Sequence, residues 1–542
     1  MTTELSLSPP WTGAAEPAPV TTRTQAGAVR GARSGGATAF LGVPYAEAPV
    51  GALRFASPRP PRSWTGLRDA TRKGAPFLQD GMPDSTEDAL LANVWTPSVD
   101  GEFPVLVYVH GGAWQVGAGS LPTYDGSLLA VEGRLVVVTF NYRLGPFGFG
   151  LHEDLADDET GLHANWGLQD QLALLEWVRG NAPAFGGDPG NITLAGTSAG
   201  GASAHQLSLL PRTRGVVRRV LAISAAHVRA PQLSMTAEHA RESTEHLAAT
   251  LGTTVRGLRS VPAGALLTTW NDLVARQPAH SGREYCGPVV DGVTMPGYDH
   301  DSPLPPVPVM SVHTRDEGTF FTVPGLSVLV PKPAPVDAAQ LRSVVRRTLE
   351  GLADDVTDDL VAECFDVYRA AAADGEIAAD PAGMWAALLG DSLLRHRVLR
   401  QAQRHAAEGR TPVHAMEFAH PALPPGVGAP HEATSKFLFG THSLPANARV
   451  FGDGPLERRI GACFRELVAS FATEGAPSGV DWPALGADGE GLLVLGGPDV
   501  AVVGSVEPSD RLAFFDRPAL APWPTPRTTK AQRRPLADRS SG

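Results

Sequence analysis

The chain has 542 residues, of which 43% are hydrophobic and 19% are charged, and these values are ordinary for a folded globular protein. Its net charge of −12 at pH 7 argues against a general affinity for nucleic acid or anionic membranes, and no run of about 18 apolar residues predicts a membrane-spanning helix. Because the three cysteines are scattered and residues 1–11 lack the basic and apolar regions of a secretory signal, the composition favours a cytoplasmic protein without a disulfide framework or zinc site.

The two ends of the chain differ in composition from the sequence between them. Residues 1–20 are rich in Pro, Ser, Thr and Ala and predict a loose N-terminal arm, and residues 521–542 predict a disordered tail. Residues 21–520 are expected to form a single domain. Within it, short and almost wholly apolar runs are typical of central strands buried on both faces of a parallel sheet. These runs are Pro104–Val109, Leu135–Phe140, Ile192–Ala195, Val220–Ser224 and Val307–Val312.

The first of these runs leads directly into a glycine-rich turn, His110-Gly111-Gly112-Ala113-Trp114. Adjacent glycines let the backbone bend sharply and approach a substrate closely. A turn of this kind after a strand can offer N–H groups to an oxyanion. An ordinary structural turn is the alternative interpretation.

A helix is predicted between the second and third runs. From Trp166 to Val178, leucine and valine recur at helical spacing. The alternation of strand and helix predicts a doubly wound α/β architecture. From about Asp337 to Glu408 the pattern is mostly helical, which predicts a helical cap over one end of the sheet.

The third run leads into Gly196-Thr197-Ser198-Ala199-Gly200, a Gly-x-Ser-x-Gly motif. The motif alone is weak evidence, but here it follows a predicted strand and precedes a helix-compatible run that ends at Pro211. Such a strand-turn-helix places the serine on a sharp turn with its hydroxyl exposed. We therefore interpret Ser198 as a nucleophile, with Ala199 N–H as one oxyanion donor.

Several further motifs follow one another along the chain. They are F-L-G-V-P-Y-A-E-A-P-V-G-A-L-R-F (Phe40–Phe55), T-E-D-A-L-L-A-N-V-W (Thr86–Trp95), N-Y-R-L-G-P-F-G-F (Asn141–Phe149), N-W-G-L-Q-D-Q (Asn165–Gln171) and Phe185–Gly201, which contains the serine motif. With these motifs in this order, the chain resembles the type-B carboxylesterase/lipase family of α/β-hydrolases, which includes para-nitrobenzyl-type esterases and cholinesterases. The resemblance implies an α/β-hydrolase fold: a central, mostly parallel, twisted sheet flanked by helices, with helical insertions over the active site.

The resemblance also implies the remaining catalytic residues. The family's acid corresponds to Glu317 in Asp316-Glu317-Gly318, and its base to His431 in G-A-P-H-E-A-T-S-K-F-L-F-G. The oxyanion donors correspond to Gly112, Ala113 and Ala199. Spacing alone does not select these residues. The residues that compete with His431 and Glu317 are His414, His420, His442, Asp316 and Asp291.

Three departures from the family pattern stand out. Ala89 replaces a cysteine of the second signature, so no disulfide can form there. The stretch Ala75–Asp84 lacks the tryptophan with which cholinesterases bind choline, so the sequence gives no support for recognition of quaternary ammonium by cation–π contact. Thr197 stands where most relatives have a glutamate that lines the active site. We expect either weaker stabilisation of cationic substrates or neutral drift at this position.

The sequence therefore predicts a serine hydrolase that cleaves small-molecule carboxylic esters through an acyl-enzyme. Trp114 and Thr197 are candidate pocket residues, although Trp114 could equally belong to the core. No metal or organic cofactor is implied, and we expect a monomer or small homo-oligomer. An acyltransferase or lactone-forming enzyme with the same triad is the first alternative. A non-catalytic interaction protein of the same fold is the second.

Overall fold

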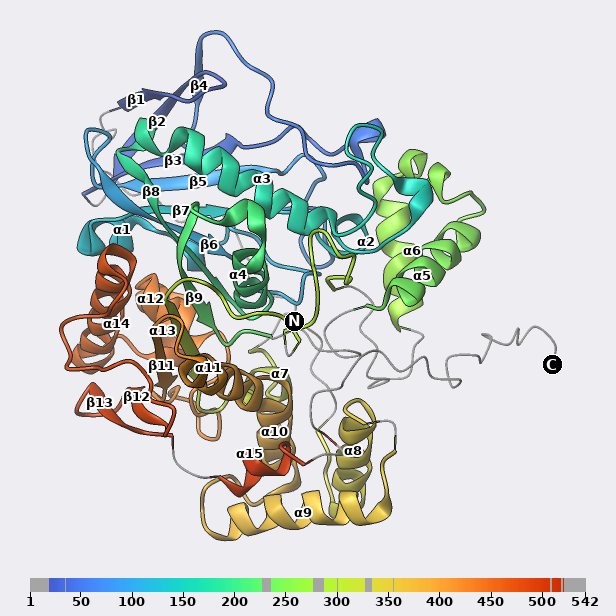
Figure 1. The fold of residues 1–542 in the computed structure, drawn as a ribbon, viewed down its shortest axis with the longest axis vertical. Coiled ribbons are helices and arrows are strands. Elements are labelled where there is room, and N and C mark those ends of the chain that lie inside the picture. Colours follow the sequence, from blue (N-terminus) through green and yellow to red (C-terminus); the bar gives the residue numbers. More distant parts are fainter. Residues whose placement is uncertain are drawn as a thin grey trace.

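The computed structural model describes residues 19–34, 36–226, 235–275, 287–299, 301–326, 334–353, 355–506, 509–517 and 520. The expected N-terminal arm and C-terminal tail therefore lie almost wholly outside the described residues. Within them, a 13-stranded sheet runs in the order β1-β2-β3-β5-β7-β6-β8-β9-β10-β11-β12-β13, with β4 beside β2 (Figure 1). The strands are β1 Pro19–Arg23, β2 Ala28–Ser34, β3 Ala37–Pro44, β4 Leu67–Asp69, β5 Leu91–Thr96, β6 Phe103–Val109, β7 Val136–Phe140, β8 Gly187–Thr197, β9 Val217–Ile223, β10 Val309–Thr314, β11 Val413–Phe418, β12 Glu490–Leu495 and β13 Ala501–Ser505.

The centre of the sheet is parallel, as the apolar runs predicted. Each of the five runs corresponds to one strand from β6 to β10, with boundaries shifted by a few residues. Neighbouring strands pair in parallel from β7 through β6, β8, β9, β10 and β11 to β12. Antiparallel strands extend the sheet at both ends.

Helices cover both faces of this sheet. Because side chains alternate along a strand, Val105 and Val107 of β6 enter one core, which includes residues of α3 and α4. Leu106 and Tyr108 enter the opposite core, which includes residues of α1, α12 and α14. Figure 1 shows α3 and α4 in front of the strands. The helices up to α7 are α1 Ser127–Gly133, α2 Gly145–Gly148, α3 Trp166–Asn181, α4 Ala199–Leu209, α5 Ala237–Thr250, α6 Ala263–Ala275 and α7 Thr319–Thr322.

The segment from 337 to 408 is helical, as expected. Its first helices form a small core of their own with α15, in which Leu349, Trp385 and Phe514 are buried, and α8 and α9 lie at the lower end of the molecule in Figure 1. The remaining helices are α8 Ala338–Glu350, α9 Asp358–Ala373, α10 Pro381–Gly390, a π-helical turn Asp391–Arg395, α11 His396–Glu408, α12 Ala433–Leu438, α13 Pro445–Phe451, α14 Pro455–Glu474 and α15 Asp510–Phe514.

Two buried ion pairs each join two of the sequence motifs, the first motif to the second and the third to the fourth. Arg54 of the first motif forms a bidentate pair with Glu87 of the second, with both N–O distances at 2.7 Å. Arg143 pairs with Asp170 in the same way, at 2.8 and 2.7 Å, and both side chains are almost fully buried. Bidentate guanidinium–carboxylate pairs fix orientation as well as distance. These charged motif residues therefore hold the fold together.

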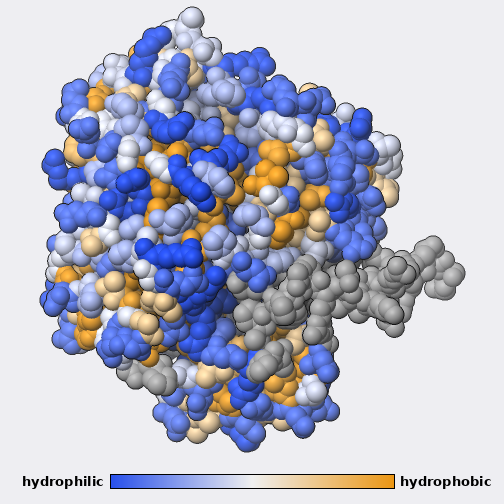
Figure 2. All heavy atoms as spheres, viewed as in Figure 1, coloured by the Kyte–Doolittle hydropathy of each residue, from blue (hydrophilic) through white to orange (hydrophobic). Residues whose placement is uncertain are grey.

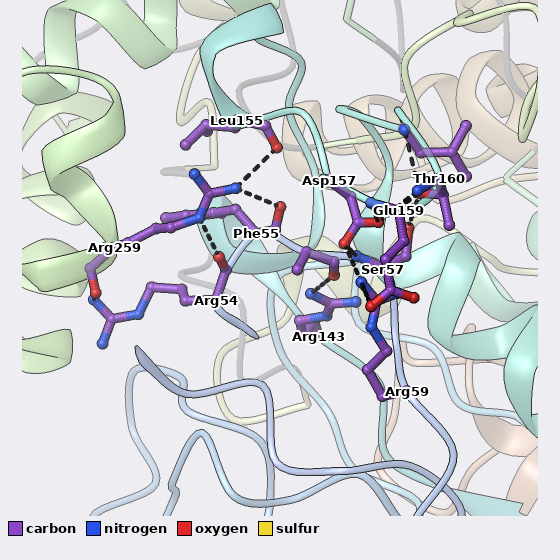
Figure 3. Close-up of polar contacts among 12 residues, drawn as sticks. Arg54, Phe55, Ser57, Arg59, Arg143, Leu155, Asp157, Glu159, Thr160 and Arg259 are labelled. Carbon is purple, nitrogen blue, oxygen red and sulfur yellow. Dashed lines mark hydrogen bonds and ion pairs between the residues drawn. The ribbon is translucent and has the colours of Figure 1, made fainter. Parts of the chain in front are cut away.

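Arg54 also connects the first motif to the segment between α5 and α6. Arg54 donates to the carbonyl oxygens of Leu258 and Val261 at 3.0 and 2.5 Å. In return, Arg259 donates to the carbonyl oxygens of Arg54 and Leu155, as the dashed lines in Figure 3 show. The segment before α6 is thus fixed to the end of the first motif.

The surface drawn in Figure 2 is mainly hydrophilic, with smaller groups of hydrophobic residues between the polar ones. Among the helices of the described ranges, none is both long and apolar enough to cross a membrane.

Candidate active site

The predicted triad residues, together with His110 and Ser224, follow the carboxyl ends of neighbouring parallel strands. His110 follows β6, Ser198 follows β8, and Ser224 follows β9. Glu317 lies three residues after β10, and His431 lies in the loop after β11. Because parallel strands end at one edge of the sheet, the crevice outside that edge is the usual ligand-binding place in α/β folds. Residues far apart in the chain therefore meet here.

Ser198 occupies a sharp turn between β8 and α4. Its backbone has φ 59° and ψ −123°, a conformation that non-glycine residues rarely adopt and that costs about 1–3 kcal/mol. A β-carbon on Gly196 would lie 2.4 Å from the Gly200 carbonyl group, and one on Gly200 would lie 2.1 Å from the Val109 carbonyl oxygen. Ser198 is partly exposed, whereas both flanking residues are buried. The two glycines thus permit a turn that presents the serine, as the motif predicted.

Glu317 and His431 are brought together by a short hydrogen bond. His431 Nδ1 lies 2.5 Å from Glu317 Oε2, and both side chains are at most 1% exposed. The other carboxylate oxygen, Oε1, accepts hydrogen bonds from Ser224 Oγ at 2.6 Å and Thr314 N–H at 2.7 Å. Burial raises the pKa of the Glu317 carboxyl, but the adjacent imidazole and these hydrogen bonds outweigh burial and hold the pKa below its ordinary value. The carboxylate therefore stays ionised.

The second ring nitrogen of His431 is free for another role. Within the described ranges, Nε2 has no hydrogen-bond partner although it is buried. The imidazole lies against the rings of Phe320 and Phe321, with ring centroids 5.4 and 5.2 Å away. With Nδ1 held by a carboxylate and Nε2 unpaired, the ring has the arrangement of a general base.

The glycine-rich turn after β6 exposes backbone N–H groups. Gly112 has φ 119°, and a β-carbon there would lie 2.0 Å from the Val116 carbonyl oxygen, so only glycine fits. Ala113 also has positive φ, 54°. Across the part of the chain that the structure describes, nothing accepts a hydrogen bond from the N–H of Gly112 or Ala113. Ala199 is the first residue of α4, so its N–H has no intrahelical acceptor either.

Gln79 holds the far end of this turn, a role that the sequence did not reveal. Its Oε1 accepts a hydrogen bond of 2.7 Å from Gly117 N–H, and its Nε2 donates to the Gly117 carbonyl at 2.9 Å. Nε2 also donates to the Phe77 carbonyl at 2.8 Å. Gln79 lies in the stretch Ala75–Asp84, which lacks the tryptophan of cholinesterases. In this chain the stretch instead supplies hydrogen bonds to the backbone of the turn.

Comparison with known proteins identifies the family to which the chain belongs. The model of the carboxylesterase family matches residues 17–502. The para-nitrobenzyl esterase of Bacillus subtilis is 32% identical over 507 residues, which cover 87% of this chain and 94% of the relative.

The chain belongs to the carboxylesterase family.

Further relatives agree with this membership. The phenmedipham hydrolase of Pseudarthrobacter oxydans is 32% identical over 504 residues, covering 88% of this chain and 96% of that protein. A solved structure of a para-nitrobenzyl esterase matches with a TM-score of 0.76 at 28% identity, covering 93% and 99% of the two chains. The expected α/β-hydrolase fold is therefore confirmed, and this family member is a carboxylic ester hydrolase.

In this carboxylesterase the histidines that competed with His431 lie elsewhere. His414 lies 5.4 Å from the Trp482 ring, and burial lowers its pKa to about 4. His442 stacks on Phe437 at 4.5 Å, and His420 lies 3.3 Å from a carboxylate oxygen of Glu457.

The competing carboxylates have structural contacts of their own. Asp316 accepts a hydrogen bond of 2.8 Å from Ala429 N–H, two residues before His431. Asp291 accepts from backbone N–H groups of its own turn, including those of Val293 and Thr294. Of the carboxylates considered, only Glu317 has a hydrogen bond to His431 among the described contacts.

Both candidate pocket residues of this carboxylesterase are buried. Trp114 is 1% exposed, belongs to the hydrophobic core and donates a hydrogen bond of 3.0 Å from Nε1 to Ser203 Oγ. The structure thus favours the core interpretation of Trp114. Thr197 is fully buried, and its hydroxyl lies 2.5 Å from Tyr108 Oη and 3.3 Å from Ser435 Oγ. Its side chain therefore contacts a buried hydroxyl cluster rather than open solvent.

Proposed function

We propose that this carboxylesterase hydrolyses esters through an acyl-enzyme on Ser198, with His431 as general base and acid and Glu317 as the residue that orients it. The observation that carries the proposal is the hydrogen bond of 2.5 Å between His431 Nδ1 and Glu317 Oε2. It lies at the sheet edge where the strained turn presents Ser198.

In the first half of the reaction Ser198 Oγ attacks the ester carbonyl and gives its proton to His431 Nε2. Glu317, which stays ionised, holds the proton on Nδ1 and stabilises the imidazolium as it forms. The imidazolium then returns the proton to the leaving alcohol, and the acyl group remains on Ser198. In the second half, water takes the place of the serine, and the same histidine takes and returns its proton.

The negative charge on the carbonyl oxygen is stabilised by the backbone N–H groups of Gly112, Ala113 and Ala199. The fold already points these donors at the position of the oxyanion, so they need not reorient when the negative charge develops. The positive φ at Gly112 and Ala113 supports this assignment, and so does the lack of an internal acceptor for these N–H groups among the described residues.

We further propose that the substrates are small-molecule esters and that the enzyme works in the cytoplasm. The relatives whose names state esterase or hydrolase activity support the first statement. The free thiols of Cys364 and Cys463 support the second, while Cys286 lies outside the described residues.

The test is covalent labelling with a fluorophosphonate probe, followed by rate measurements on para-nitrophenyl esters of increasing acyl length. We expect one adduct, on Ser198, and loss of both labelling and turnover in Ser198→Ala. Glu317→Gln should keep the fold but lower kcat by about 10³- to 10⁴-fold, since the imidazole loses its orienting carboxylate. Turnover that survives in Ser198→Ala, Glu317→Gln and His431→Ala alike would place the site elsewhere.

A further inference from the structure

Glu432 lies immediately after His431 and directs its carboxylate to the side of the nucleophile. Its backbone is left-handed, with φ 61°, and its side chain is 13% exposed. Glu432 Oε1 lies 2.9 Å from the point where a β-carbon on Gly111 would stand, and Ser198 Cβ lies 3.2 Å from the same point. Because Gly111 has no side chain, the Glu432 carboxylate and the Ser198 side chain both come close to the same point of the turn.

A chain of hydroxyl groups fixes one oxygen of this carboxylate. Ser435 Oγ donates a hydrogen bond of 3.0 Å to Glu432 Oε2. Ser435 Oγ in turn lies 3.0 Å from Tyr108 Oη and 3.3 Å from Thr197 Oγ1. Burial and then the charge of Glu432 raise the pKa of Tyr108, so the phenol keeps its proton and donates. All three hydroxyls can therefore donate in turn, with the carboxylate as the last acceptor.

The other carboxylate oxygen remains available. Lys436 Nζ lies 3.5 Å from Oε2, on the side already held by Ser435. Among residues with described positions, no donor makes a hydrogen bond to Oε1, the atom that faces Gly111. A carboxylate oxygen that is held in a fixed direction and largely buried beside the nucleophile can interact with charge on a bound substrate.

Thr197, immediately before the serine, carries no charge of its own. Its hydroxyl lies 3.3 Å from Ser435 Oγ, and Ser435 donates a hydrogen bond to the carboxylate of Glu432. The carboxylate on this side of the serine therefore comes from the residue after the histidine.

We propose that Glu432 is a specificity-determining residue of this carboxylesterase. Its carboxylate favours esters that carry a positive charge near the scissile bond over uncharged esters of the same shape. The inference rests on the proposed function, since it requires Ser198 to be the residue that attacks the ester.

The experiment compares two substrates that differ in charge alone, 2-(trimethylammonio)ethyl butyrate and its uncharged isostere 3,3-dimethylbutyl butyrate. In Glu432→Gln the ratio of the two kcat/KM values, charged over uncharged, should fall by at least about tenfold, because unit charges several ångströms apart near a protein surface interact by more than the roughly 1.4 kcal/mol that a factor of ten requires. The uncharged ester should keep its kcat/KM within about twofold. Glu176→Gln is the matched control, because it makes the same chemical change at an exposed residue of α3 and should leave the ratio unchanged.

A second measurement needs no variant. In the wild-type enzyme the preference for the charged ester should weaken as salt is raised, since ions screen an interaction that remains partly accessible to solvent. An unchanged ratio in Glu432→Gln, or an equal loss for both esters, would overturn the proposal and leave Glu432 a structural role only. Failure of the proposed function is distinguishable, because Ser198 would then not be labelled and the uncharged ester would not depend on it.

Discussion

Ser224 Oγ donates a hydrogen bond of 2.6 Å to Glu317 Oε1, while the other oxygen of that carboxylate lies 2.5 Å from His431 Nδ1. Ser224 follows β9 directly, between the strands that carry Ser198 and Glu317. The hydrogen bond therefore sets the rotation of the carboxylate and, through it, the direction of the imidazole.

We expect Ser224→Ala to lower kcat by roughly tenfold, the effect of losing about 1–1.5 kcal/mol of orientation. Glu317 keeps its hydrogen bond from Thr314 N–H, so the carboxylate should stay ionised and the protein folded. Steady-state rates on a para-nitrophenyl ester measure the effect. Ser470→Ala, which removes a hydroxyl hydrogen-bonded within α14, is the control. An unchanged kcat in Ser224→Ala would show that Thr314 alone is sufficient.

Gln79 should matter for catalysis although it touches no substrate. In Gln79→Ala the Gly117 end of the turn loses two hydrogen bonds, and the N–H groups of Gly112 and Ala113 lose part of their fixed direction. We expect kcat to fall by roughly tenfold or more, with little change in KM. Gln340→Ala, at an exposed position near the start of α8, is the matched control. A rise in KM with constant kcat would contradict a role in stabilising the transition state.

The ion pair between Arg54 and Glu87 should contribute to stability rather than to activity. Removing one member leaves a buried charge without its partner, so Glu87→Gln should lower the free energy of unfolding by about 3–5 kcal/mol. Urea unfolding measures this change, and the kcat of the protein that remains folded should be nearly that of the wild type. Glu159→Gln, at an exposed carboxylate near Arg59, should have a much smaller effect. Equal effects of the two substitutions would contradict the assignment.

The C-terminal segment should loosen in acid. Asp516 lies 2.8 Å from His396 Nε2 and also contacts Arg400. Burial alone would raise its pKa, but these contacts outweigh burial and lower the pKa from 3.8 to about 2. A carboxylate with a lowered pKa in the folded protein stabilises the fold above pH 3.8, and this contribution is lost as the pH falls towards 2. Wild type should therefore melt at a higher temperature than Asp516→Asn at pH 6, and the difference should shrink below pH 4. A difference that grows in acid would have the wrong sign.

The sequence predicted those parts of the fold that depend on neighbouring residues. The strands β6 to β10 are short apolar runs because both faces of the central sheet are covered. The turns at Ser198 and Gly112 follow from glycines next to strand ends. By contrast, the strands β1 to β4 were not predicted, and β1 and β4 have the mixed composition and partial exposure of a sheet edge.

The proposed partners of Ser198 could be named only through the resemblance to the family. Glu317 and His431 are 114 residues apart, and their meeting depends on the order of β10 and β11 in the sheet. Nothing local distinguishes His431 from His414 or His442 before burial is known. The contacts of Gln79 and Glu432 were not predicted for the same reason, since each side chain lies against the turn after β6, which is distant from it in the sequence.

The most direct measurement is to trap the acyl-enzyme. Wild-type protein mixed with a para-nitrophenyl ester and quenched within the first turnover should release a burst of para-nitrophenol. Intact-mass and peptide analysis should then locate one acyl group on Ser198, and no adduct should form in Ser198→Ala. A burst with the acyl group on another residue, or turnover in Ser198→Ala at the wild-type rate, would contradict the account.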